Sequence, residues 1–597
     1  MNVFAVYTAC RTERTAVAPL WNDISKFVGI GVDPDYALYG ANSGKKARQV
    51  DDFVDDPTSA ISVNQAGDYL AGIVWGTGEG IFDLKPSSQV LELVDSEVVD
   101  DYFAYATKQT LLHMNHHEAG YSTALRTYMY DQVAFGTSGI GIFPNNGFKD
   151  GVDDNALICR QYGVDNVCID VGKSNLIDYV FATYNWRVSR IIGEFCMVDG
   201  VISAEKVATL PKKIRDAYGK NDINQKFDIV FGMMPRTDYN PRLKGKRGTK
   251  FRGVWFMADK NVKDNAFFLE EDFNEKPINI ARMIVVRGEV WGRSSGTMLL
   301  SSIRSVNYMV GTAIEVIEKM ADPALGMFSN AIFGDGVLDS SPSGLTVFNS
   351  TLAGASGGNP VFPLFDVGNP SALVEFLIPY LNEKITTAFK VDALLDFNSD
   401  TDMTATETLK RSVIRGQSLS GILIQQKNER LIPDVRRSVS VLDDLGELGI
   451  NPTINEARAT KLRQAGRIER IIPQAVLDVK ATGRSWYEIR FNNELEKIIR
   501  TEKVQNLLQI LQTILAIMQA QPDIVHAVNW YKLLKDINDN LDANNEILLS
   551  ETEFKDKMVG IAKQRAEAQT AAMAQSTAET GKTVAQTTQA QKETRNA

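Results

Sequence analysis

The hydrophobic pattern of this chain changes its period twice, and this change most limits the folds open to it. From about residue 135 to 287, short β-branched and aromatic runs such as GIGIF, NVCIDV, DYVFATYNW, FDIVFGMM and GVWFMA alternate with Gly, Asn and Asp, which is typical of antiparallel strands. The preceding residues are predicted to be mainly helical. After the strands, apolar residues recur at three- and four-residue spacing from Ile303 to Met320, the pattern of an amphipathic helix. The sequence therefore predicts a predominantly helical α+β fold.

Two helical stripes bracket a segment rich in Gly, Ser, Asn and Pro at residues 323–370. The first stripe should end at Asp322-Pro323, because the residue before a proline is disfavoured in a helix. The second stripe spans 371–389 and contains Pro379, which predicts a kink. A short acidic loop follows it.

Helical patterns continue toward the C-terminus. A run from Thr404 to about Leu431 would be roughly 40 Å long at 1.5 Å per residue, and Pro433 should end or bend it. From about Asn451 the pattern is helical again. Residues 561–597 are Ala, Gln and Thr with scattered charge. They cannot bury enough apolar surface to offset ordering entropy, so a frayed helix or disorder is expected.

Length and composition limit the class of protein. A chain of 597 residues is too long for one core and indicates about three to five domains or layers. Its net charge is −10, whereas sequence-reading DNA-binding proteins usually carry a basic face. Four cysteines without CxxC spacing argue against a zinc site or disulfide framework and favour a reducing compartment. The N-terminus lacks a signal-peptide pattern, and the long uncharged run at 504–522 is interrupted by glutamines, so no membrane helix is expected.

No motif demands an enzyme. TGKT at 580–583 lacks the first Gly of a Walker A loop, and GANSGKK near Gly40 has the wrong spacing. His113, His116 and His117 would share a helical face and could join a metal site, although a polar helix face is the simpler interpretation. GTSGIG runs into a strand pattern and indicates a tight turn. No catalytic, cofactor-binding or metal-binding residue is predicted, since no acid–base or nucleophile set stands out.

The strongest basic cluster lies in PRLKGKRGTKFR. Its members are Arg242, Lys244, Lys246, Arg247, Lys250 and Arg252. Such a cluster could contact DNA or a neighbouring subunit. Since GKRG is also favourable turn chemistry, a hairpin tip between strands is the alternative interpretation.

Two blocks of the chain resemble the portal (head-to-tail connector) proteins of short-tailed, podovirus-type bacteriophages. KPINIARMIVVRGEVWGRSSGTMLLSSIRSVNYMVGTAIEVIEKMADPAL, at 276–325, has a proline-led strand, a Gly-Glu turn, an aromatic residue, Gly-Arg-Ser and a helix ending in Asp-Pro. ITTAFKVDALLDFNSDTDMTATETLKRSVIRGQSLSGILIQQKNERLIPDVRRSV, at 385–439, has an Ala-Phe pair, an acidic loop, Met-Thr-Ala-Thr-Glu and a helix with Glu-Arg-Leu-Ile-Pro. FGTSGIGIF is a third, weaker similarity to the same family. The order and spacing of these blocks make the resemblance specific.

The resemblance implies a protomer with wing, stem, clip and crown that assembles, usually as twelve copies, into a homo-oligomeric ring with a central channel. The implied segments are a wing at 1–290, a first stem helix at 291–322, the clip at 323–370, a second stem helix at 371–389, a channel loop at 390–403, a long wing helix at 404–450, crown helices at 451–560 and a low-complexity tail at 561–597.

The resemblance also implies a function in the virion without a cofactor or a membrane. The ring would be assembled in the host cytoplasm and sit at one capsid vertex, where double-stranded DNA is packaged and ejected without sequence-specific binding. Its protein partners would be terminase, the major capsid or scaffolding protein, tail adaptors and internal ejection proteins. The alternatives are another structural virion protein, such as a head-tail adaptor or internal core protein, and a nucleic-acid enzyme. The missing phosphate loop and metal clusters disfavour the enzyme.

The acidic loop is the implied lining of the channel. Its carboxylates would repel backbone phosphates and favour sliding of the DNA, although the last of them is also placed to cap the following helix. They are Asp392, Asp396, Asp400 and Asp402.

Overall fold

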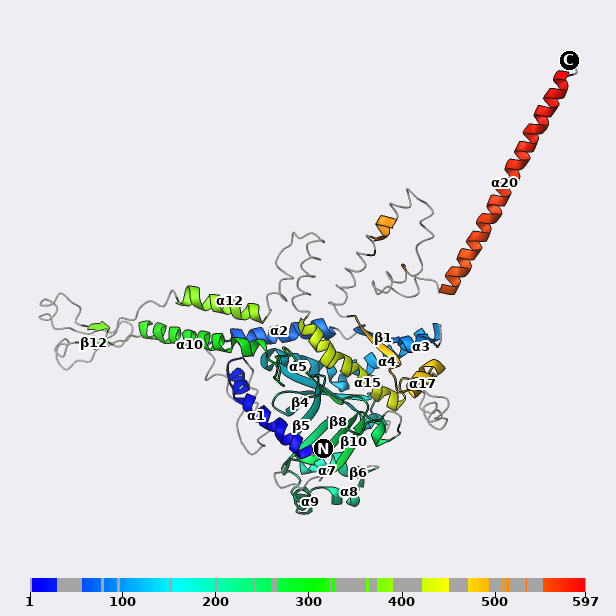
Figure 1. Cartoon of the computed structure of the whole chain (residues 1–597). Coiled ribbons are helices and arrows are strands. Elements are labelled where there is room, and N and C mark those ends of the chain that lie inside the picture. The colour runs from blue at the N-terminus through cyan, green and yellow to red at the C-terminus, as the bar shows by residue number, and fades with distance from the viewer. Residues whose placement is uncertain are drawn as a thin grey trace, which may run out of the picture. The chain divides into compact units, whose positions relative to one another are not determined.

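A computed structural model describes most of the chain (Figure 1). The described residues are 3–28, 56–76, 80–93, 97–149, 153–198, 201–240, 243, 245–258, 267–321, 325–327, 361–363, 373–389, 421–449, 471–492, 507, 510–514, 533 and 551–595. They fall into two compact units, 1–493 and 494–597. The acidic loop with Asp392, Asp396, Asp400 and Asp402 lies outside the described residues.

The N-terminal part is mainly helical, as predicted. One short strand interrupts it. The elements are α1 (Val3–Phe27), α2 (Thr58–Trp75), β1 (Phe82–Pro86), α3 (Ser88–Leu91), α4 (Glu97–Asn115), the 3₁₀ turn η2 (His117–Ala119) and α5 (Tyr121–Phe135).

All five strand runs named from the sequence are strands, and they form two antiparallel sheets. The larger sheet has the order β10-β9-β8-β5-β4, and the smaller has the order β11-β2-β3. Their members are β2 (Thr137–Pro144), β3 (Leu157–Tyr162), β4 (Val167–Val171), β5 (Ile177–Arg187), β8 (Lys226–Pro235), β9 (Phe251–Met257), β10 (Leu269–Phe273) and β11 (Ile278–Arg282). The apolar side of α1 packs on the larger sheet, where Tyr7 and Cys10 meet Phe181 and Phe256 in one core cluster.

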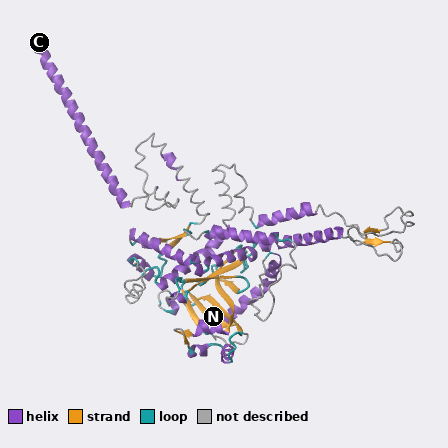
Figure 2. Cartoon of the chain, turned by 180° about the vertical axis from the view of Figure 1, so that it is seen from behind, coloured by secondary structure: helices purple, strands orange, loops and turns teal. Residues whose placement is uncertain are grey.

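A small helical lobe connects β5 to β8. Its central helix α7 buries Val188, Ile191, Ile192 and Cys196. The lobe consists of α7 (Val188–Cys196), the hairpin of β6 (Met197–Val198) and β7 (Val201–Ile202), α8 (Ala204–Thr209) and α9 (Lys212–Gly219). In Figures 1 and 2 this lobe lies at the end of the sheets farthest from α10 and α12.

A pair of helices leaves the sheets on the other side (Figure 2). α10 (Ser295–Ala321) is helical up to the residue before Asp322-Pro323, and this predicted stop lies outside the described residues. α12 (Ile378–Ala388) packs along α10. Between them, β12 (Leu325–Met327) pairs antiparallel with β13 (Val361–Pro363). We call α10, β12, β13, η4 (Leu373–Leu377) and α12 the helix arm.

Two prolines lie where a π-helical turn passes into an α-helix. Pro433 does not end its helix, because the helix η6 (Lys427–Leu431) and α15 (Ile432–Leu445) run continuously past it. In both η6 and η4 the backbone adopts a π-helical turn directly before an Ile-Pro pair. Each proline is then the second residue of the α-helical part, where the wider π-helical turn before it accommodates the missing N–H. A shift of hydrogen-bonding register thus accommodates both prolines, and the bends expected at Pro379 and Pro433 stay predictions.

The C-terminal part departs from the predicted continuous helix. After α17 (Gln474–Ala481), β14 (Tyr487–Phe491) is a strand and pairs antiparallel with β1. Residues 561–597 were expected to form a frayed helix or to be disordered. They lie in α20 (Glu551–Arg595), which is helical up to Arg595, since Ala, Gln, Glu and Lys are strong helix formers. None of the described helices is long and apolar enough to cross a membrane.

Candidate functional site: the helix arm and its anchor

The helix arm begins at a buried N-cap. Ser294 Oγ accepts a hydrogen bond from the Thr297 backbone N–H at 2.9 Å, which satisfies one of the free donors at the start of α10. The same hydroxyl donates to the Ala134 carbonyl at 2.7 Å. The Gly-Arg-Ser part of the first block therefore caps the arm and ties it to the end of α5.

Two glycines let the loop before α10 touch the start of β2. Gly136 ends α5 in the left-handed conformation with φ of 83°, a conformation that favours glycine. A Cβ on Gly136 or Gly292 would overlap backbone atoms of the other segment. The Gly292 N–H donates to Thr137 Oγ1 at 2.9 Å. The tight turn predicted for GTSGIG is therefore a helix-to-strand turn, and it forms half of this anchor.

Buried ion pairs hold η6, which carries the Glu-Arg of the second block, against the smaller sheet. Arg282 on β11 donates to Glu429 Oε1 at 2.6 Å, and the two side chains are 1% and 2% exposed. Glu429 Oε2 also accepts the Arg282 backbone N–H at 2.8 Å. Breaking a buried pair typically costs about 3–5 kcal/mol, because the remaining charge is left uncompensated. This pair therefore fixes the π-helical turn to the sheet.

A second buried network lies one residue further along. Arg430 donates to Asp434 at 3.2 Å, and both side chains are fully buried. The Tyr121 hydroxyl donates to Asp434 at 3.1 Å, and Asn279 Nδ2 donates to it at 2.8 Å. Burial raises the pKa of Asp434 to about 6, with Arg430 opposing the shift. The network joins α5, β11 and α15.

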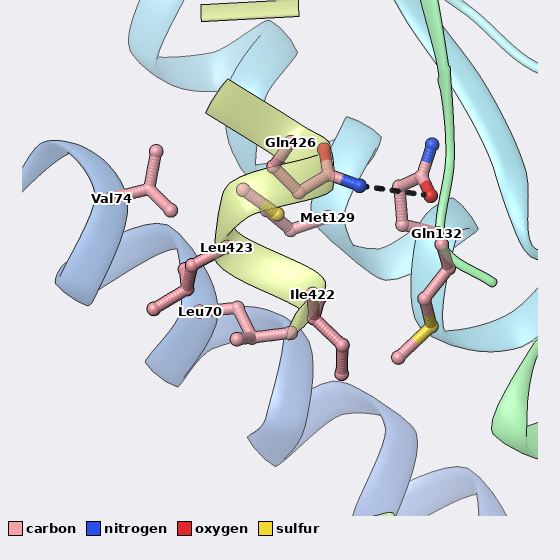
Figure 3. Close-up of a pocket in the computed structure, with 8 residues that line it drawn as sticks. Leu70, Val74, Met129, Gln132, Ile422, Leu423 and Gln426 are labelled. Atoms are coloured by element: carbon pink, nitrogen blue, oxygen red, sulfur yellow. Dashed lines mark hydrogen bonds between the residues drawn. The ribbon is translucent and has the colours of Figure 1, made fainter. Parts of the chain in front are cut away.

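A small pocket lies between α2, α5 and the helical residues 421–426 (Figure 3). Gln426 Nε2 donates to Gln132 Oε1 at 3.4 Å at its edge. Its other lining residues are Leu70, Val74, Met129, Met283, Ile422 and Leu423. The enclosed space has room for no more than about one water molecule, so it serves packing rather than ligand binding.

The far end of the helix arm is apolar and exposed. Ile314, Ile317 and Met320 continue the stripe of α10 that Ile303 and Val306 bury near the base. The second helix of the arm, formed by η4 and α12, exposes four further large side chains. These are Val374, Phe376, Leu377 and Tyr380.

The basic cluster of 242–252 is divided by the structure. Arg242 and Lys244 lie outside the described residues. Each of the other four has a carboxylate partner near the β8–β9 turn. The pairs are Lys246–Glu270 at 3.4 Å, Arg247–Asp238 at 3.4 Å, Lys250–Glu275 at 3.3 Å and Arg252–Glu270. This turn includes the 3₁₀ segment η3 (Lys246–Gly248), as the hairpin interpretation predicts.

The three histidines do not share a helical face. α4 ends at Asn115, and η2 starts at His117. His113 is buried, and its Nδ1 accepts the Ala156 N–H at 3.4 Å, whereas His116 caps η2. In the described part of the chain, no three metal-binding side chains gather at one point.

Sequence reasoning missed the functions of Gly136, Gly292, Arg282 and Glu429. The sequence shows Gly136, Gly292 and Arg282 only as members of the family motifs, without indicating which contacts they make. Nothing in the local pattern indicates that Arg282 and Glu429, 147 residues apart, meet in the interior.

The family comparison agrees with these motifs. The family described as "Bacteriophage head to tail connecting protein" matches residues 2–548. Among solved structures, a chain of "Virion of native gene transfer agent (GTA) particle" is 11% identical, with 72% of this chain and 91% of that chain covered and a TM-score of 0.28. A chain of "Neck of empty GTA particle computed with C6 symmetry" is 11% identical, with 70% and 91% covered and a TM-score of 0.27. A search of curated proteins found no match.

Proposed function

The chain belongs to the family of bacteriophage head to tail connecting proteins, and we propose that it is the portal that forms the DNA conduit at one capsid vertex. Twelve copies would close a ring around a channel, through which double-stranded DNA is packaged and later ejected. Terminase would dock on the ring during packaging, and tail adaptors would replace it. Capsid or scaffolding protein and internal ejection proteins would be further partners in a virion assembled in the host cytoplasm.

The helix arm is the observation that best supports this proposal. α10 would be the first stem helix, and η4 with α12 the second, while β12 and β13 would form the base of the clip. The helix from residue 421 through α15 would be the end of the long wing helix, and the two sheets would belong to the wing. The buried anchor of Ser294, Gly292 and Arg282 would hold the stem on the wing.

The acidic charge of the chain also fits a conduit. A net charge of −10 disfavours phosphate contacts along the channel, each of which would add electrostatic affinity that slows the passing duplex. The assignment of Asp392, Asp396, Asp400 and Asp402 to a loop that lines the channel is proposed from the sequence.

The first test is the native mass of the purified full chain, with negative-stain images of the same sample. Closed rings of about a dozen copies with a hole wide enough for duplex DNA are expected, because heterologous contacts that close produce rings. Filaments, or rings without a through-channel, would favour an adaptor or an internal core protein instead. A chain that stays monomeric even with its capsid and scaffolding proteins contradicts the proposal.

A further inference from the structure

We propose that the helical lobe carries a surface that binds the phosphate backbone of duplex DNA, separate from the conduit. The surface is formed by five exposed cations, which we call the α9 basic patch. They are Arg187, Lys212, Arg215, Lys220 and Lys226. The 242–252 cluster, which the sequence singles out, is a weaker candidate.

The fold of α9 collects three of these cations on one side. Ile214 and Ala217 are its buried residues, and α9 packs on α7. At 100° per residue, Lys212 and Arg215 project from the side opposite these two. Lys220 follows at the C-cap. Asp216 shares this exposed side, but it forms no ion pair with the described residues.

The adjoining strand ends place two more cations together. Arg187 at the end of β5 is directly opposite Lys226 at the start of β8. Like charges in such a cross-strand pair are destabilising. The backbone next to them joins α7, since the Val188 N–H donates to the Gln225 carbonyl at 2.9 Å. A like-charge pair at the edge of a basic helix is favourable when an anion lies over it.

The α9 basic patch and the 242–252 cluster differ in whether carboxylates pair with their cations. Among the described residues, no carboxylate lies within ion-pair distance of any member of the α9 basic patch. By contrast, Lys246, Arg247 and Lys250 each have a carboxylate partner at 3.3–3.4 Å. DNA must displace those carboxylates to use these cations, whereas the α9 basic patch is available at no such cost.

The surface fits nucleic acid better than a protein partner. The core of a protein interface is built from apolar and aromatic side chains with charges at its rim. Ile214 and Ala217 of α9 are buried, and the large apolar residue exposed among the patch cations is Ile223, between Lys220 and Lys226 in the sequence, at 42%. Phosphate contacts need only cations and backbone donors. In both cartoon views α9 lies at the end of the sheets away from the helix arm (Figures 1 and 2), so, if the arm lines the conduit, this surface contacts DNA elsewhere.

The test is the affinity of the full chain for a fluorescent duplex of about 25 base pairs, measured as a function of salt. The variant K212A/R215A/K220A removes three patch cations. Its matched control, K246A/R247A/K250A, removes the same charge from the ion-paired cluster. All six residues are exposed, so thermal melts and negative-stain images should be unchanged in both variants.

The patch variant is expected to bind DNA at least tenfold more weakly at 50 mM salt, with a log–log salt slope smaller by up to about 2.7, because each phosphate contact contributes about 0.9. The control should stay within about twofold of the wild type. Equal losses in the two variants would show that only net charge matters, and absence of wild-type binding at low salt would also overturn the proposal. A patch variant that loses binding to polyglutamate but not to DNA would assign the surface to an acidic protein.

Discussion

At the residue scale, Asp131 is a buried carboxyl whose charge the interior disfavours. Burial raises the pKa of Asp131 well above its usual value, and the nearby Asp165 raises it further. Gln161 and Ser138 donate hydrogen bonds to it and oppose the shift. Because the folded-state pKa is above the unfolded-state value of about 3.9, the folded chain binds the proton more tightly. The resulting stabilisation is complete below that value and is lost as the pH rises through the folded-state pKa.

Asp131→Asn is therefore expected to stabilise the chain at neutral pH. Asn keeps the shape and an acceptor oxygen but carries no charge to desolvate. The Tm at pH 7 should rise by about 2 °C, whereas at pH 4 wild type and variant should melt alike. Differential scanning calorimetry at both pH values measures this. A variant that melts lower at pH 7 than the wild type would mean that the ionised carboxylate is needed.

At the element scale, the anchor of the helix arm depends on close backbone contact. Gly292→Ala would place a Cβ against the Gly136 carbonyl and Arg282, so one of the segments must move. We expect a loss of about 3 kcal/mol or more in the free energy of unfolding, seen as a lower midpoint in urea. Gly193→Ala is the control, since nothing lies within 4 Å of its added Cβ. In the helix α7 this substitution should be neutral or slightly stabilising.

The exposed stripe of the helix arm belongs to the same scale. The seven large side chains at its far end expose on the order of 600 Å² together. They form two patches, one on α10 and one on η4 with α12. Two different patches on each copy suit the heterologous contacts of a ring.

Ile317→Ser combined with Phe376→Ser should therefore weaken the proposed ring without unfolding the chain. The two side chains are 51% and 72% exposed, so the Tm of the subunit should hardly change. Each buried apolar side chain contributes about 1.5–3 kcal/mol, and the fraction of rings in native mass spectra should fall at least tenfold. Val201→Ser, at a side chain 69% exposed in the lobe, should leave the ring intact. Equal ring yields from the double variant would exclude this face as a subunit contact.

At the scale of the whole molecule, the pairing of β1 with β14 closes the first unit. It joins Leu84 to Ile489 across about two-thirds of the chain. The connecting turn packs through Trp486 on Phe103, and Lys480 pairs with Asp443 at 2.7 Å. This pairing sets the place at which the chain leaves the first unit.

Ile489→Pro should open this closure while the two sheets stay folded, because proline cannot donate to a strand ladder and constrains the backbone. Trypsin is expected to cut after Lys480, Arg484 or Arg490 at least tenfold faster than in the wild type. Ile489→Val keeps the strand and should be cut at the wild-type rate. Unchanged cleavage of the proline variant would show that side-chain packing alone holds this segment.

The sequence by itself determined the elements whose signal is local. The alternating runs became β2, β4, β5, β8 and β9, and the stripe from Ile303 to Met320 became α10. Motif order alone indicated the connector family that the comparison confirmed. These features depend on periodicity and proline sterics that act within a few residues.

Only the tertiary structure decided the features that depend on distant partners. β14 is a strand because it forms backbone hydrogen bonds with β1. The ion pair of Arg282 with Glu429 is buried because β11 and η6 pack against each other. The cations of 246–252 are neutralised by carboxylates of other segments, while those of the α9 basic patch are not. The periodicity of the sequence does not predict these contacts between distant segments, because desolvation and charge pairing depend on which segments the fold brings together.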